Sequence, residues 1–199
     1  MASQVYCEQA NKCNNEEIYH TINVLDSAIK NCEKVKFQHR TRKIDKEKRK
    51  SYTTKTFIVS PYGLVWKNDN YYLICNKESH NNLINMRLDR IRNIIVLKTP
   101  ARPVWECCDY KDGFDVADYT SKMFNMFGGE IMPVTFVCDL DLREQILDRF
   151  GEKVKLIGVD INHFSTTVDV AVSDGLASWI MQFGDKIKVQ EPACPVDLI

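Results

Sequence analysis

Residues 59–97 read VSPYGLVWKNDNYYLICNKESHNNLINMRLDRIRNIIVL, and this stretch decides the fold of the N-terminal half of the chain. Apolar and polar residues alternate along residues 62–66 and 71–75, and the polar run between them is typical of a hairpin turn. Residues 83–86 and 93–97 add two further apolar runs. Short strands joined by tight polar turns predict a small, strongly bent, barrel-like sheet.

An amphipathic helix is expected before this sheet, over residues 15–31. Asn14 and Glu17 form a capping-box-like pair, and apolar residues recur after them at helical spacing. Residues 35–39 then alternate as a first strand, and residues 54–60 form a β-rich run that leads to Pro61. Pro61 is expected either to end that strand or to mark a bulge.

A strongly charged loop, residues 40–50, separates these two strands. It holds seven Lys and Arg residues against Asp45 and Glu47. One interpretation is an ordinary solvated hairpin tip. The others are an arm that engages phosphates and a contact surface for an acidic protein partner.

The C-terminal half shows a regular alternation of strands and helices. After a proline-containing linker at residues 99–103 and a short helix that begins near Asp115, residues 131–191 predict the order β-α-β-β-α-β. The first helix is expected to be capped by Asp141 with Glu144 and stopped by Gly151. This order is that of the ferredoxin-like layout, with two helices on one face of an antiparallel sheet.

Charged residues are distributed unevenly between the two halves of the sequence, and enzyme motifs are scarce. Residues 1–99 hold 18 Lys and Arg against 10 Asp and Glu, whereas residues 100–199 hold 9 against 17. The basic half is the better candidate for an anionic partner, although the two halves could simply attract each other.

The eight cysteines form no metal-binding spacing and are expected to be reduced thiols. No catalytic motif is present, so neither an enzyme, a metal site nor a cofactor is expected.

Three motifs within residues 61–91 resemble the WYL domain of bacterial transcriptional regulators. They are Pro61-Tyr62-Gly63-Leu64, Tyr71-Tyr72-Leu73 and Arg87-x-Asp89-Arg90-Ile91. The resemblance implies an α+β fold with four parts. These are a connector helix region (1–31), a small Sm/SH3-like β-barrel (32–99), a linker with a short helix (100–129), and a ferredoxin-like βαββαβ extension domain (130–199). It also implies a DNA-binding head before residue 1, so the chain is expected to be a fragment or a headless relative.

Arginines and tyrosines near one edge of the predicted barrel are the candidate ligand-binding residues. Arg87 and Arg90 each offer a planar guanidinium that can donate two hydrogen bonds to a phosphate. Tyr62 and Tyr72 could add an aromatic face for stacking. The alternative is that the tyrosines split between core and surface and that Asp89 neutralises one arginine. The WYL resemblance places the ligand groove among these residues. It adds two more candidates, because an aromatic common in the family is His39 here and Arg92 could replace a basic residue lost near position 84.

The resulting hypothesis is the ligand-sensing part of a transcriptional regulator. Its effector is expected to be an anionic small molecule, such as a nucleotide, or a single-stranded nucleic acid. Duplex DNA is expected to be bound only through the missing head, because no helix-turn-helix pattern is visible. No membrane span or signal peptide is found in the sequence, so a cytoplasmic homodimer is expected.

Overall fold

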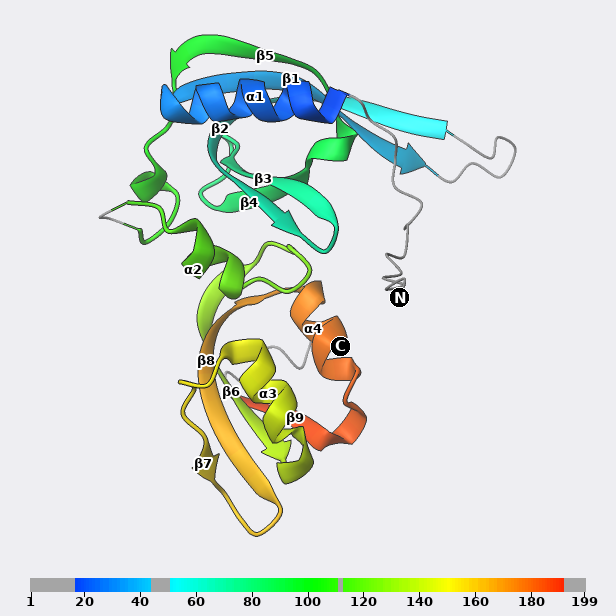
Figure 1. Ribbon diagram of the computed structural model, residues 1–199, viewed down its shortest axis with the longest axis vertical. Helices are drawn as coiled ribbons and strands as arrows, with labels where there is room; N and C mark the ends of the chain where they lie inside the picture. The colour runs from blue at the N-terminus through cyan, green and yellow to red at the C-terminus, as the bar shows by residue number, and fades with distance from the viewer. Residues whose placement is uncertain (1–16, 44–50, 111–112, 192–199) are drawn as a thin grey trace, which may run out of the picture.

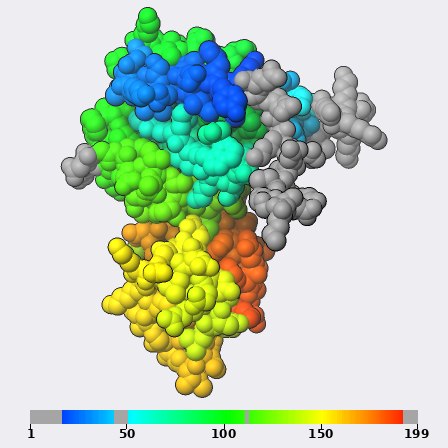
Figure 2. Space-filling view, in the orientation of Figure 1, coloured from blue at the N-terminus to red at the C-terminus, as the bar shows by residue number. Residues whose placement is uncertain are grey.

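A computed structural model describes residues 17–43, 51–110 and 113–191 of the 199-residue chain. The fold is α+β, as predicted, with one N-terminal helix followed by two antiparallel sheets. Figure 1 shows the two sheets at opposite ends of the molecule, and Figure 2 shows them as two lobes stacked along its long axis. The expected cap at Asn14 and residues 44–50 of the basic loop lie outside the described residues.

The N-terminal half is a five-stranded sheet covered by one helix. Its elements are α1 (Glu17–Lys30), β1 (Glu33–Lys43), β2 (Ser51–Lys67), β3 (Asn70–Asn76), β4 (Leu83–Arg87), the 3-10 turn η1 (Leu88–Arg90) and β5 (Ile91–Pro100). The strand order is β4-β3-β2-β1-β5. Leu25 and Ala28 of α1 are completely buried and belong to the same apolar cluster as Val35 and Phe37 of β1. The predicted helix is therefore confirmed over Glu17–Lys30, and it packs on its own sheet.

One long strand, β2, joins the two parts of this sheet. Its first part pairs with β1 and its second part with β3, and the register shifts between Pro61 and Gly63. The predicted break at Pro61 is therefore a bulge inside one continuous, bent strand. Strands β4 and β5 are the two edges, and no pairing between them occurs among the described residues. A closed barrel is thus not seen.

The C-terminal half has the predicted β-α-β-β-α-β order. Its elements are β6 (Glu130–Asp139), the 3-10 turn η3 (Leu140–Leu142), α3 (Arg143–Phe150), β7 (Ile157–Gly158), β8 (His163–Val172), α4 (Asp174–Met181), the 3-10 turn η4 (Gly184–Lys186) and β9 (Ile187–Glu191). The strand order is β7-β8-β6-β9, with antiparallel pairing throughout. Both helices pack their apolar residues against β6 and β8 around Phe136, which is completely buried.

The helix boundaries of this half agree only in part with the predictions. Gly151 ends α3 with a φ of 91°, and Ser173 caps α4 by accepting a hydrogen bond from the Leu176 N–H. The expected cap of α3 by Asp141 with Glu144 is wrong. The turn η3 leads directly into α3 without a side-chain cap, so the first orphan N–H groups are covered by tight 3-10 bonding.

A bridging segment, residues 101–129, connects the two sheets. It contains η2 (Val104–Glu106) and α2 (Val116–Ser121), and Asp115 caps α2 by accepting from the N–H groups of Ala117 and Asp118, as predicted. A third apolar cluster fills the seam between the sheets and the bridging segment. Its buried members are Tyr72, Ile74, Leu83, Cys107, Tyr119, Met123, Met126 and Ala171. In the described part of the chain, no helix is long and apolar enough to cross a membrane.

Candidate ligand site

The turn between β4 and β5 fixes one of the predicted arginines in place. Leu88 of η1 is completely buried and anchors the turn to the core. Arg87 donates from Nε to Oδ1 of Asp89 at 3.0 Å and from Nη2 to Oδ2 at 2.9 Å. Two parallel charged hydrogen bonds of this kind are strong and geometrically specific. The alternative in which Asp89 neutralises one arginine is therefore what the structure shows for Arg87.

Arg92 supports the same turn from the beginning of β5. Its Nη1 donates to the carbonyl oxygens of Asp89 at 2.9 Å and Ile91 at 2.7 Å. Its Nε lies 3.7 Å from Oε2 of Glu17, the first described residue of α1. Arg92 thus ties η1 to the helix and has few donors left for a ligand.

Arg90 is the arginine that faces solvent. Its side chain is exposed, and within the described residues it makes no hydrogen bond or ion pair. Arg90 directly precedes Ile91, which pairs with His39 across β1 and β5, and this pairing brings the Arg90 charge close to the His39 ring. Burial lowers the pKa of His39 most, the Arg90 charge lowers it further, and the Asp89 carboxylate partly offsets both effects. Arg90 and His39 therefore share one electrostatic environment, although 51 residues separate them in the sequence.

His39 borders a groove of about 370 Å³ on one face of the β1–β2 pair. The groove is lined by His39, Thr41, Thr53, Lys55 and Phe57. His39 pairs with Lys55 across the strands, and Phe57 lies two residues further along β2, so all three point to the same face. The His39 ring meets the Phe57 ring edge-on at a centroid distance of 5.9 Å. Lys77 Nζ lies 5.5 Å from the Phe57 centroid.

This arrangement combines an aromatic surface with three cations. Phe57 and His39 provide the rings, and Lys55, Lys77 and Arg90 provide the positive charges around them. Planar bases stack on the faces of aromatic side chains, and cations bind phosphate. The groove is therefore suited to an anion that carries a planar ring. We call these five residues the groove site.

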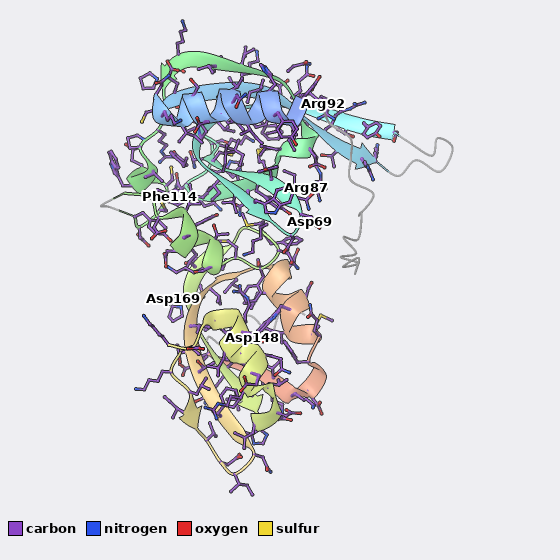
Figure 3. The ribbon with its side chains drawn as sticks, in the orientation of Figure 1. Asp69, Arg87, Arg92, Phe114, Asp148 and Asp169 are labelled. Carbon is purple, nitrogen blue, oxygen red and sulfur yellow. The ribbon has the colours of Figure 1, made fainter. Side chains whose placement is uncertain are left out.

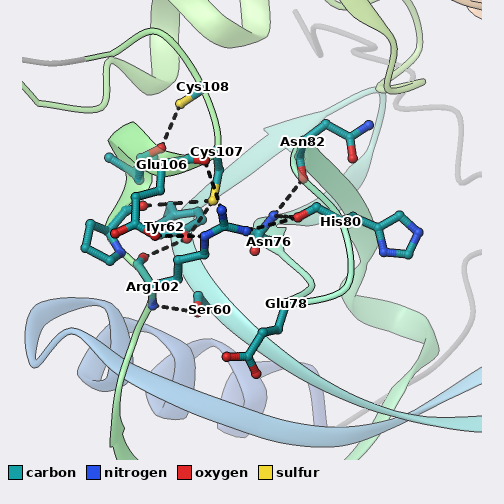
Figure 4. A network of polar contacts seen from close by, with 12 residues as sticks. Ser60, Tyr62, Asn76, Glu78, His80, Asn82, Arg102, Glu106, Cys107 and Cys108 are labelled. Atoms are coloured by element: carbon teal, nitrogen blue, oxygen red, sulfur yellow. Dashed lines mark hydrogen bonds and ion pairs between the residues drawn. The ribbon is translucent and has the colours of Figure 1, made fainter.

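The two predicted tyrosines lie elsewhere. Tyr72 is a cross-strand neighbour of Arg87, but it is buried in the seam cluster. Tyr62 also lies in the seam, where its hydroxyl donates to the Arg102 carbonyl at 2.8 Å and is 3.6 Å from Cys107 Sγ (Figure 4). Burial raises the pKa of Tyr62 far above its ordinary value. Neither tyrosine lines the groove.

The six predicted site residues are thus divided between two faces of the N-terminal half. Figure 3 places Arg87 and Arg92 on the side from which the β1–β2 hairpin projects, and Phe114 of the bridging segment on the opposite side. Lys55, Phe57 and Lys77 were not predicted. The hairpin register could have indicated Lys55 and Phe57, because it places them on the face of His39. Nothing in the sequence pairs Lys77 with Phe57.

A second hollow, of about 390 Å³, lies at the far end of the C-terminal half. It is lined by Asp139, Leu140, Asp141, Asn162 and His163. His163 Nε2 lies 3.3 Å from Asp139, and its Nδ1 lies 2.8 Å from Asp160. Because carboxylates dominate this hollow, it does not suit an anionic ligand. Among the described residues, no three His, Cys, Asp or Glu side chains gather as metal ligands.

The depressed pKa of His39 gives a testable pH dependence of stability. The folded-state pKa lies below the ordinary value of 6.5, so below that pH the unfolded chain binds more protons than the folded one. The contribution of His39 to the free energy of unfolding is therefore fully present above pH 6.5. It is lost as the pH drops toward the folded-state pKa of His39. We expect urea unfolding between pH 5 and 8 to show a steeper acid loss in the wild type than in His39→Gln. Identical pH profiles would contradict this assignment.

Residues 20–96 match the family model of the WYL domain. This segment is a WYL domain. It begins within α1 and ends within β5, and it contains every residue of the groove site. The resemblance seen in the sequence motifs is thus confirmed for this part of the chain.

Comparison with solved structures finds proteasome accessory factor B/C (PafBC) of Arthrobacter aurescens. The sequence identity is 14% and the TM-score is 0.39. The match covers 94% of this chain but only 26% of the PafBC chain, so the chain spans about a quarter of that protein's length. A search of curated proteins found no match.

Proposed function

We propose that this chain is the ligand-sensing part of a bacterial transcriptional regulator, and that the groove site of its WYL domain binds an anionic effector. The effector is a nucleotide, an oligonucleotide or a single-stranded nucleic acid. The observation that carries the proposal is the exposed Arg90 beside the His39–Phe57 ring pair, with Lys55 and Lys77 at the same surface. A phosphate would meet these cations while a base lies against the rings.

The predicted site residues then have distinct parts in the proposal. His39 and Arg90 contact the effector, whereas Arg87 and Arg92 hold η1 in the shape that presents Arg90. Tyr62 and Tyr72 face the bridging segment and could transmit a change in the sheet to the C-terminal half. Because a bound anion favours a protonated His39, effector affinity should increase as the pH falls.

The finer fold assignments are part of the same proposal. The bent β2 and the sheet order β4-β3-β2-β1-β5 support an Sm/SH3-like sheet for residues 32–99. The order β7-β8-β6-β9 with two helices supports a ferredoxin-like domain for residues 130–199. In this proposal the C-terminal domain serves a cytoplasmic homodimer or relays the signal to a DNA-binding head.

Replacing Arg90 tests the effector site directly. We expect Arg90→Ala to weaken binding of a fluorescein-labelled single-stranded oligonucleotide or cyclic nucleotide by about tenfold to a hundredfold, the usual cost of losing a charged hydrogen bond. The measurement is a fluorescence anisotropy or calorimetric titration. Arg143→Ala is the matched control, because Arg143 is exposed on α3 far from the groove. Equal binding by the wild type and Arg90→Ala would remove the site assignment.

A further inference from the structure

A two-stranded ribbon projects from the N-terminal sheet. It consists of residues 40–43 of β1 and 51–54 of β2, which pair from Arg40 opposite Thr54 to Lys43 opposite Ser51. The last β1 residue that pairs with β5 is His39, and β3 pairs with β2 only from Ser60 onward. Among the described strands, the ribbon is therefore paired only with itself. Figure 1 shows it extending away from the body of the molecule.

The ribbon is cationic on both faces. Arg40 and Arg42 point to one face, and Lys43 points to the other, where Lys55 lies at the base of the ribbon. All four side chains are exposed, and none forms an ion pair with a carboxylate of the described residues. Residues 40–43 and 51–54 contain no Asp or Glu. Within the described ranges, no carboxylate therefore neutralises the positive charge of the ribbon.

Other features of the ribbon suit contact with phosphates. The Arg40 guanidinium lies 4.3 Å from the centroid of the Tyr52 ring, which orders this arginine without engaging its hydrogen-bond donors in an ion pair. Thr41, Thr53 and Thr54 add exposed hydroxyl groups. Hydroxyls of this kind commonly donate to phosphate oxygens alongside Arg and Lys.

The dimensions of the ribbon match a nucleic-acid groove. Four residue pairs at about 3.3 Å per residue make a ribbon roughly 13 Å long, and its two backbones lie about 4.8 Å apart, which leaves room for side chains within a wide groove. The major groove of B-DNA is about 12 Å wide and about 8.5 Å deep, and it admits a two-stranded β-ribbon. A ribbon inside this groove has phosphates along both walls, which accounts for cations on both faces. An acidic protein surface would engage only one face.

We propose that the ribbon docks into the major groove of duplex DNA through Arg40, Arg42, Lys43 and Lys55, largely by contacts to phosphate. This contact shares Lys55 with the groove site, but its other residues, Arg40, Arg42 and Lys43, lie outside that site, so it does not depend on effector binding. It differs from the sequence-based expectation that duplex DNA is bound only by a missing head, because the ribbon belongs to the WYL domain itself.

The salt dependence of duplex binding is the quantitative test. The full chain is titrated into a labelled 20-bp mixed-sequence duplex by fluorescence anisotropy between 50 and 200 mM KCl. Four phosphate contacts predict a slope of log K against log salt of about −3.6, and Arg40→Gln/Arg42→Gln should reduce it to about −1.8. The same variant should bind about tenfold to a hundredfold more weakly at 50 mM. Lys153→Gln/Lys155→Gln, which removes two exposed charges from the C-terminal half, should leave both quantities unchanged.

Three further measurements decide between this proposal and its rivals. Arg42→Gln/Lys43→Gln repeats the test while keeping the Arg40–Tyr52 contact, and it should weaken binding similarly. Arg90→Ala should bind the duplex as the wild type does. Loss of duplex binding by Arg90→Ala alone would place the DNA at the groove site and overturn the proposal. Equal duplex binding by the wild type and both ribbon variants would also overturn it. Ribbon-dependent binding of poly-glutamate without duplex binding would identify an acidic protein partner instead.

Discussion

Phe136→Ala is expected to lower the free energy of unfolding by about 3–5 kcal/mol, the usual cost of truncating a buried phenylalanine. Phe136 is completely buried in β6. Its ring centroid lies 6.2 Å from that of Phe150 of α3 and 6.0 Å from that of Trp179 of α4. Its removal opens a cavity where both helices meet the sheet, and the rigid strand cannot close it. Urea unfolding followed by tryptophan fluorescence measures the loss.

A second phenylalanine provides the control for Phe136. Phe127 lies at the end of the bridging segment and is 49% exposed. We expect Phe127→Ala to cost less than about 1 kcal/mol, because about half of this residue is already exposed to water. Similar losses for the two variants would show that Phe136 is not the centre of the C-terminal core.

Arg149→Ala is expected to lower the free energy of unfolding by about 2–4 kcal/mol, because it removes two charged hydrogen bonds to backbone carbonyls. Arg149 belongs to α3 but reaches the end of α2, where it donates to the carbonyl oxygens of Ser121 at 3.0 Å and Met123 at 3.2 Å. Its guanidinium also lies 4.1 Å from the centroid of the Phe124 ring. Arg149 is half-buried, and this burial lowers its pKa.

The Arg149 variant also tests how the two halves are joined. Lys67 of β2 donates to the Thr120 carbonyl at 2.9 Å and to the same Met123 carbonyl at 3.2 Å, so cations from both halves of the chain bind carbonyls at the C-terminal end of α2. Burial, and then the Arg149 charge, lower the pKa of Lys67. A double-mutant cycle with Lys67→Met should therefore give a non-additive free energy. Arg143→Ala, on the exposed side of α3, should be neutral. Additive effects, or a loss below about 1 kcal/mol for Arg149→Ala, would show that Arg149 and Lys67 do not act together in joining the two halves.

Local patterns in the sequence predicted most of the secondary structure. Alternation over ten residues predicted β8, helical spacing predicted α1 and α4, and Gly151 marked the end of α3. These signals are local, because side-chain periodicity follows directly from backbone geometry. The two alternatives that the sequence left open at Pro61 have the same origin. A proline can either end a strand or bulge it, and only the pairing of β2 with both β1 and β3 shows which.

The candidate site was predicted less well because it depends on long-range contacts. The sequence indicated Arg90 and His39. It could not show that both carboxylate oxygens of Asp89 would accept hydrogen bonds from Arg87. It also could not show that Tyr72 would be buried against the bridging segment. Strand alternation assigns Tyr71 and Tyr72 to opposite faces, but it does not say which face another part of the chain will cover.

The sequence by itself determined the order of the elements, the basic character of the N-terminal half and the membership of residues 20–96 in the WYL domain family. The tertiary structure decided which charges are already satisfied and which remain open to a partner. A guanidinium pairs with the acceptors that lie nearest to it in space. In this protein those distances are set by sheet register and by the packing of the bridging segment.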